Sequence, residues 1–234
     1  MLVVGGVETH RRCKSAASIR LEQNPPEILK INPDHFARQI TLIELEKLQA
    51  IKSEEFRTFK WTGQDKEKFA PNIVASTRWF NQLNLWVQKE ILNQENLSCR
   101  SDVLSHFITI AQYLISYNNF SSAMAIMSSL QTEAIFRLRR TWMHLSEEAK
   151  NNYRKLEAIF SQTDNSCKLK CMTEKAELPV IPYLGIYLTE LVYINTAHPR
   201  DGGKPNPVWL RKISSVIEKI AFYQQSSYRE FTRA

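Results

Sequence analysis

Apolar residues recur three and four positions apart through most of the chain after residue 30, which is the spacing of one face of an α-helix. In the most regular stretch they come in adjacent pairs, a rhythm typical of a helix buried along a broad face. These positions are Val103, Leu104, Phe107, Ile108, Ala111, Leu114 and Ile115. Asn118 and Asn119 end the stretch. The pattern predicts an all-α fold, built as a multi-helix orthogonal bundle.

Polar residues in front of the apolar runs predict where helices begin. Thr41 and Glu44 have the spacing of a capping box and precede an apolar face, so we expect a helix to start at Thr41. Pro71 precedes another predicted helix. Ser121 is expected to cap the helix after Asn119, a further helical segment carries Ile135, Leu138 and Trp142, and Ser146 is expected to start another helix.

The last third of the chain has the pattern of a helical hairpin. Residues 161–182 are polar and are predicted to be irregular. Residues 184–196 form an apolar helical stretch, and His198–Pro207 is rich in the helix breakers Pro and Gly. A second amphipathic stretch carries Trp209, Ile213, Val216, Ile217 and Ile220. Two arms of about 13 residues would each reach about 20 Å, so we expect a protruding antiparallel hairpin.

Composition excludes several classes of protein. Only 6 of the 234 residues are glycine, which disfavours a β-sandwich or a glycine-rich nucleotide loop. The net charge is +7, but the basic residues are scattered, so no nucleic-acid stripe is predicted. No apolar run approaches the length of a membrane span. The spread of the four cysteines suggests free thiols, and we expect a cytoplasmic protein, with recruitment to the plasma membrane through other regions as an option.

The motifs of covalent catalysis are missing. There is no P-loop, Rossmann fingerprint, zinc-protease motif or nucleophile elbow, and the five histidines are isolated. His106 is interpreted as a surface residue or a hydrogen-bonded core residue. Cys167 and Cys171 lie four apart, but no further pair completes a zinc site. We therefore expect no metal, no cofactor and no enzyme chemistry, and function should lie in a binding surface.

Four blocks of sequence, in order, resemble the Ras exchange-factor catalytic domain, also called the Cdc25-homology or RasGEF domain. They are Phe36–Glu44, Ala70–Ile73 with Phe80–Leu83 and Trp86–Val87, Asn118–Met124 leading into Leu130–Gln131 and Phe136–Trp142, and Pro182–Leu191. The resemblance runs from about residue 33 to 228. It implies a guanine-nucleotide exchange factor that promotes GDP release from a Ras-family small GTPase.

The subtype resembles exchange factors for Ral. The run Leu191–Ala197 is similar to theirs, whereas Ras-directed members more often carry Leu and Glu where this chain has Val192 and Thr196. Gln131 stands where Ras-directed members often have Asn. No preceding helical exchanger motif is present, as in the Ral group that carries a lipid-binding domain. The resemblance therefore implies Ral as first partner, then Rap or Ras.

The resemblance also implies which residues act. The hairpin, about residues 184–223, would displace switch I of the GTPase, with Val192 at the Mg²⁺ site and Thr196 near the phosphate site. The implied catalytic residues are Leu188, Val192, Asn195 and Thr196. The implied GTPase-binding residues are Arg78, Gln131, Glu133, Phe136, Arg137 and Tyr183, most of them on the body surface that grips switch II.

Several of these residues allow a structural interpretation. Phe136 could belong to the core, Arg137 could serve a structural salt bridge, and Val192 could pack between the hairpin arms. Trp86 and Trp142 are expected in the core.

Two departures from the family pattern support an alternative function. Asn165–Lys168 stands where the family usually has an aromatic residue and a nearby Tyr-Arg. The chain ends soon after Tyr228, before the last helix of many members. We therefore predict a flexible lead-in at 1–30 and a RasGEF domain at 31–234 that lacks this helix. The alternative is an inactive adaptor that keeps the fold and binds a GTPase or scaffold without exchange.

Overall fold

Every regular element that the structure describes is helical. The computed structural model describes residues 26–161, 167–198 and 206–232. In chain order the elements are the 3₁₀ helix η1 (Glu27–Lys30) and the α-helices α1 (Pro33–Ala50), α2 (Ser53–Thr58), α3 (Lys66–Phe69), α4 (Pro71–Leu92), α5 (Leu97–Ser116), α6 (Phe120–Leu130), α7 (Glu133–Phe136), α8 (Arg139–His144), α9 (Glu147–Phe160), α10 (Cys167–Lys175), α11 (Leu184–Ala197) and α12 (Pro207–Tyr223). This confirms the predicted all-α class.

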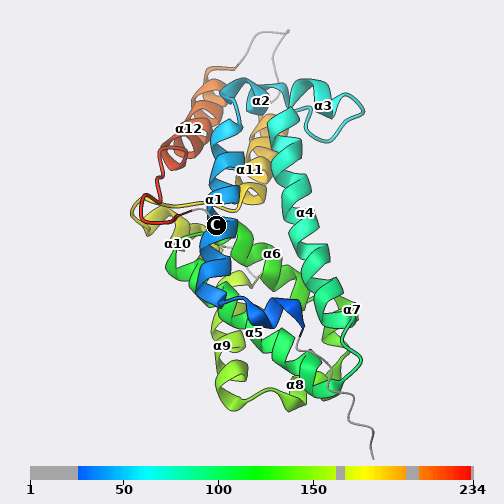
Figure 1. Ribbon diagram of the computed structural model, residues 1–234. Helices are drawn as coiled ribbons and strands as arrows, with labels where there is room; N and C mark the ends of the chain where they lie inside the picture. The colour runs from blue at the N-terminus through cyan, green and yellow to red at the C-terminus, as the bar shows by residue number, and fades with distance from the viewer. Residues whose placement is uncertain (1–25, 162–166, 199–205, 233–234) are drawn as a thin grey trace, which may run out of the picture.

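The molecule is elongated, and its two ends carry different helices (Figure 1). The helices α2, α3, α11 and α12 lie at one end, and α5, α7, α8 and α9 lie at the other. The long helices α1 and α4 extend from one end toward the other, with α6 between them. The hairpin arms therefore stand apart from most of the helical body.

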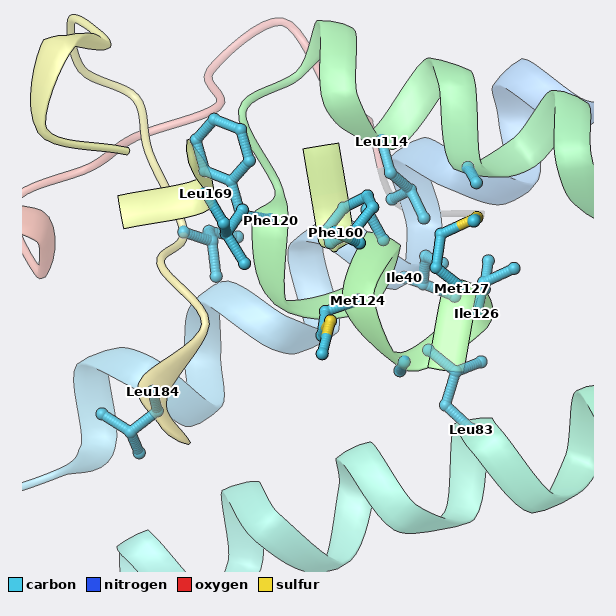
Figure 2. Close-up of a cluster of buried hydrophobic side chains, with 14 of the residues drawn as sticks. Ile40, Leu83, Leu114, Phe120, Met124, Ile126, Met127, Phe160, Leu169 and Leu184 are labelled. Carbon is cyan, nitrogen blue, oxygen red and sulfur yellow. The ribbon is translucent and has the colours of Figure 1, made fainter. Parts of the chain in front are cut away.

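Helix α6 forms the centre of the hydrophobic core. Every residue of this helix except Ser128 is buried, and α1, α4 and α5 all pack on it. Figure 2 shows side chains of α6 meeting those of four neighbouring helices, among them Leu83, Ile40, Leu114 and Phe160. Full burial of each such side chain stabilises the fold by roughly 1.5–3 kcal/mol. Trp86 and Trp142, predicted as core residues, are half-buried and pack against this core.

The predicted capping box at Thr41 is wrong. Helix α1 begins at Pro33, and the side chain of Asn32 accepts hydrogen bonds from the backbone N–H groups of Asp34 and His35. Thr41 and Glu44 lie inside the helix and are buried. The pattern misled because Glu44 does not turn back to the helix start; it faces α6.

Two further predicted helix starts have different outcomes. Asn119, not Ser121, caps α6, because its side chain accepts a hydrogen bond from the N–H of Ser122 over 3.0 Å. Ser121 is buried and donates instead to Glu44 over 2.9 Å. The predicted cap at Ser146 is confirmed, since its hydroxyl accepts from the N–H of Ala149 over 3.1 Å.

Two segments predicted to be irregular contain helix. Helix η1 lies within the predicted flexible lead-in, and it buries Ile28 against the core. Helix α10 lies within the predicted irregular stretch 161–182 and buries Leu169 and Thr173. Both helices are short, and neither has enough apolar positions to establish a period. The rest of the lead-in, residues 1–25, and the departure at 165–166 lie outside the described residues.

The predicted hairpin is present as two helices that pack together, α11 and α12. Most of the breaker run that joins them, residues 199–205, lies outside the described residues. The hairpin is flanked by other helices, since α12 contacts α2 and the ends of α1 and α4 lie at the same end of the molecule (Figure 1). It therefore extends from most of the helical body, with α2 packed against α12.

Candidate functional site: the hairpin and the α4–α7 surface

The two ends of the hairpin are joined at its base. The buried hydroxyl of Ser226 accepts a hydrogen bond from the N–H of Val180 and donates one to the carbonyl oxygen of the same residue, both over 2.8 Å. Ile181 exchanges backbone hydrogen bonds with the start of α6, donating to Asn118 and accepting from Phe120. The segments that enter and leave the hairpin are therefore fixed to each other and to the core.

An aromatic contact sets how α11 leaves this base. The rings of Tyr183, just before α11, and Phe80 on α4 lie 5.2 Å apart between centroids. Gly185 leaves room for the Tyr183 ring, because a Cβ atom at Gly185 would lie 2.5 Å from the ring carbon Cζ. Tyr183 was predicted to bind the GTPase; its position at the root of the hairpin adds a structural role.

Near the tip, a side-chain hydrogen bond joins the two arms. The indole N–H of Trp209, in the first turn of α12, donates to Oδ1 of Asn195 on α11 over 3.1 Å. The ring of Phe59, which ends α2, lies 6.2 Å from the Trp209 ring. The predicted catalytic residue Asn195 therefore also holds the arms together.

The four predicted catalytic residues lie along one stripe of α11. Leu188, Val192, Asn195 and Thr196 have the i, i+4, i+7, i+8 spacing of a single helix face. Val192 is 48% exposed, so the alternative that it packs between the arms is wrong. Thr196 is also exposed and donates its hydroxyl hydrogen to the carbonyl oxygen of Val192 over 3.0 Å. This bond occupies the only hydroxyl hydrogen of the threonine.

Tyr193 belongs to the same exposed surface and was missed by sequence reasoning. Its side chain is 72% exposed beside Val192. Exposed aromatic residues are enriched in protein interfaces. The apolar run of residues 184–196 gave no sign of which members face outward.

The other predicted binding residues lie on α4 and around α7. Phe136 is 69% exposed, so the alternative that it is a core residue is wrong. Arg137 pairs with Glu133 over 3.3 Å, but both side chains are largely exposed, so this pair contributes little stability. Gln131 is exposed at the end of α6. Arg78 pairs with Glu67 over 2.6 Å and is also exposed.

The predicted residues therefore form two patches joined by α4. The first half of α4 carries Arg78 and contacts the hairpin root through Phe80, and α7 lies beside its other end (Figure 1). Arg78 and Leu92 are 14 positions apart in α4, which corresponds to about 21 Å at 1.5 Å per residue. A partner that touches both patches must be as wide as a small protein domain.

In the ranges that the structure covers, no group of three or more His, Cys, Asp or Glu side chains could hold a metal ion. His106, expected to be a surface residue or a hydrogen-bonded core residue, is half-buried. Burial lowers the pKa of its ring, and its Nε2 has no hydrogen-bond partner among the described residues. None of the helices described has the length and apolarity that a bilayer crossing requires.

Residues 35–213 match the RasGEF domain family. The chain belongs to the RasGEF domain family. The match begins in α1 and ends within α12, so it includes the body surface, α11 and the first part of α12. The four sequence blocks were therefore interpreted correctly.

Curated relatives agree with this assignment. The chain is 39% identical over 209 residues to the mouse Ras-specific guanine nucleotide-releasing factor RalGPS1, covering 88% of this chain and 36% of that protein. It is 39% identical to human RalGPS2 over 86% of this chain and 35% of that protein. It is 31% identical to rat Ras-specific guanine nucleotide-releasing factor 1 over 82% of this chain and 16% of the relative. These matches confirm the predicted Ral-type RasGEF domain, and the chain spans about a third of the length of the RalGPS proteins.

Proposed function

We propose that this RasGEF domain is a guanine-nucleotide exchange factor for a Ras-family small GTPase, with Ral as first partner and Rap or Ras next. The observation that carries the proposal is the stripe of Val192 and Thr196, exposed on a hairpin that is fixed at its base by Val180 and Ser226. A fixed base allows the exposed stripe to push against a partner without being pushed aside.

In the proposed mechanism, the body surface holds the GTPase while the hairpin displaces its switch I loop. Phe136 and Arg78 lie at opposite ends of the α4–α7 surface and would grip switch II. Val192 would enter the space of the Mg²⁺ ion, where an apolar side chain offers no ligand. Because the Thr196 hydroxyl is committed to the Val192 carbonyl, its methyl group would face the phosphate site. Displacement would then be steric, without charge repulsion.

Exchange needs no covalent chemistry. A domain that binds the nucleotide-free GTPase more tightly than the loaded one lowers nucleotide affinity by the same factor. Each 1.4 kcal/mol of differential binding changes the affinity about tenfold. Contacts made only to the opened switch loops would therefore accelerate GDP release.

Release of a fluorescent GDP analogue from Ral, Rap and Ras tests the proposal. At a micromolar concentration of the domain, we expect faster release of the GDP analogue from Ral than from Rap or Ras. No acceleration with any of the three would contradict exchange activity. Stable binding to nucleotide-free GTPase without faster release would instead identify the adaptor that keeps the fold.

A further inference from the structure

Helix α10 contacts both arms of the hairpin through ion pairs. Nζ of Lys170 lies 2.7 Å from Oε2 of Glu190 on α11, and Glu174 accepts a hydrogen bond from Lys219 on α12 over 2.8 Å. Lys170 and Glu174 are four residues apart, so they share one face of α10. One face of a nine-residue helix thus reaches both arms.

Helix α10 is also anchored in the helical body. Leu169 and Thr173, the neighbours of Lys170 and Glu174 in sequence, are buried, and α10 packs against α9. Leu169 belongs to the central cluster of Figure 2. Because adjacent positions on a helix differ by about 100°, α10 can be anchored in the core by one face and reach the hairpin with the next.

Both carboxylates of these pairs lie near the contact between the arms. Tyr187 of α11 and Tyr223 of α12 are buried, and their hydroxyl groups lie 3.4 Å apart. Burial and this contact raise the pKa of Tyr187, with smaller contributions from the carboxylates of Glu174 and Glu190. Hydrogen bonding to Glu174 raises the pKa of Lys219, to which Glu190 also contributes. The two ion pairs therefore lie close enough to interact, and they form a small charge network where α10, α11 and α12 meet.

Partial burial makes the Lys170–Glu190 pair stronger than ordinary surface pairs, whereas Lys219 and Glu174 are more exposed, at 43% and 38%. Lys170 and Glu190 have side chains that are 31% and 30% exposed, against 74% and 82% for Arg137 and Glu133. Exposed single pairs contribute little, whereas networks and less solvated pairs contribute more. Glu190 also lies two residues from Val192, on nearly the opposite side of α11, so the network holds the back of the stripe that would face the GTPase.

We propose that α10 is a strut that sets the position of the hairpin for exchange, with Lys170, Glu174, Glu190 and Lys219 as positioning residues. The inference rests on the proposed exchange function. Breaking the strut lets α11 move away from α10, so the hairpin reaches switch I less often, while the α4–α7 surface still binds the GTPase.

Charge reversal tests the strut. Lys170→Glu places two carboxylates together. We expect nucleotide release at a saturating concentration of the domain to slow roughly fivefold. The concentration of the domain that gives the half-maximal rate should change much less. The double variant Lys170→Glu/Glu190→Lys restores the pair and should recover most of the rate. Lys168→Glu makes the same charge change on the exposed side of α10 and should leave the rate unchanged.

A second measurement separates failure of the strut from failure of the exchange function. Amide hydrogen exchange of α11 and α12 needs no GTPase. We expect faster exchange of these amides in Lys170→Glu, with recovery in the double variant, while α5 and α6 stay protected. Unchanged hairpin protection in Lys170→Glu overturns the strut, whatever the nucleotide-release assay shows. If the hairpin amides exchange faster in Lys170→Glu but the unsubstituted domain never accelerates nucleotide release, the strut is supported and the proposed exchange function is contradicted.

Discussion

The indole N–H of Trp209 donates to the side-chain oxygen of Asn195 and so joins the first turn of α12 to the last turns of α11. Trp209 is almost fully buried, and a buried donor that loses a partner costs free energy. Asn195→Ala should therefore lower the free energy of unfolding by about 1 kcal/mol. Urea denaturation measures this difference. Asn195→Asp keeps a hydrogen-bond acceptor, so its free energy of unfolding should fall less. Equal decreases in the two variants would show that this hydrogen bond does not contribute to stability.

The close approach of Tyr183 to Gly185 gives a prediction with a matched control. In Gly185→Ala the new methyl group would collide with the Tyr183 ring, which must then move from Phe80. We expect a loss of roughly 1–3 kcal/mol in stability and slower nucleotide release. Gly63→Ala meets no atom within 4 Å and should be neutral in both assays. Replacing Tyr183 by Leu in the Gly185→Ala background should relieve the collision and restore stability, whereas no recovery would place the strain elsewhere.

The buried carboxyl group of Glu44 should make stability depend on pH. It accepts hydrogen bonds from the hydroxyl groups of Ser121 and Ser122 over 2.9 and 3.1 Å, but burial dominates and raises its pKa above the ordinary 4.5. The folded state then holds this proton more tightly than the unfolded chain. The resulting stabilisation is complete below the unfolded pKa and is lost as the pH rises through the folded pKa.

Glu44→Gln removes this titration and keeps the shape of the side chain. We expect the stability of this variant, relative to the natural chain, to increase between about pH 4 and about pH 8. Denaturant unfolding at several pH values gives the difference at each pH. Parallel profiles for the two proteins would contradict a raised pKa at Glu44.

Phe136 should matter for binding and not for folding. Because it is 69% exposed, Phe136→Ala should change the free energy of unfolding by less than about 0.5 kcal/mol. An aromatic anchor at an interface contributes about 1–2 kcal/mol or more, so the GTPase concentration for half-maximal exchange should rise about tenfold. Met143 on α8 is 68% exposed and gives the control, because Met143→Ala should leave exchange unchanged. If Phe136→Ala and Met143→Ala had equal effects on exchange, the assignment of Phe136 to the GTPase-binding site would be contradicted.

Val192 should affect the rate of nucleotide release at a saturating concentration of the domain. An arginine in place of Val192 carries a large charged group into the proposed path to the Mg²⁺ site. We expect the maximal rate of nucleotide release to fall at least about tenfold, which corresponds to 1.4 kcal/mol. Ser215→Arg on an exposed position of α12 controls for added charge on the hairpin. A full rate with Val192→Arg would contradict the assigned stripe.

The sequence predicted the long helices because their apolar periods were long enough to be recognised. The prediction from sequence failed where a polar residue could either cap a helix or form a buried hydrogen bond. Thr41 and Glu44 have the spacing of a cap, yet the carboxylate is a buried acceptor for α6, and only the packed structure distinguishes the two. Helix α10 was missed because most of its residues are polar, and two of them, Lys170 and Glu174, make ion pairs with α11 and α12.

Much of the candidate site came from resemblance, and the structure added what faces outward. The spacing of Leu188, Val192 and Thr196 predicts one helix face, but a uniformly apolar helix cannot show which face is buried. Tyr193 was overlooked for this reason. Phe136 had two interpretations because its neighbour Ile135 is buried while Phe136 itself points to solvent. Exposure depends on tertiary packing, which the local pattern does not contain.

The joined base of the hairpin has a practical consequence for engineering. Val180 and Ser226 are in hydrogen-bonding contact, so the segment between them begins and ends at nearly the same point in space. A segment with coincident ends can be exchanged as a unit when its substitute also keeps the contacts with Phe80, α2 and α10. Chimeras that exchange residues 181–225 between members of this family can therefore test whether selectivity for a GTPase depends on the hairpin or on the rest of the domain.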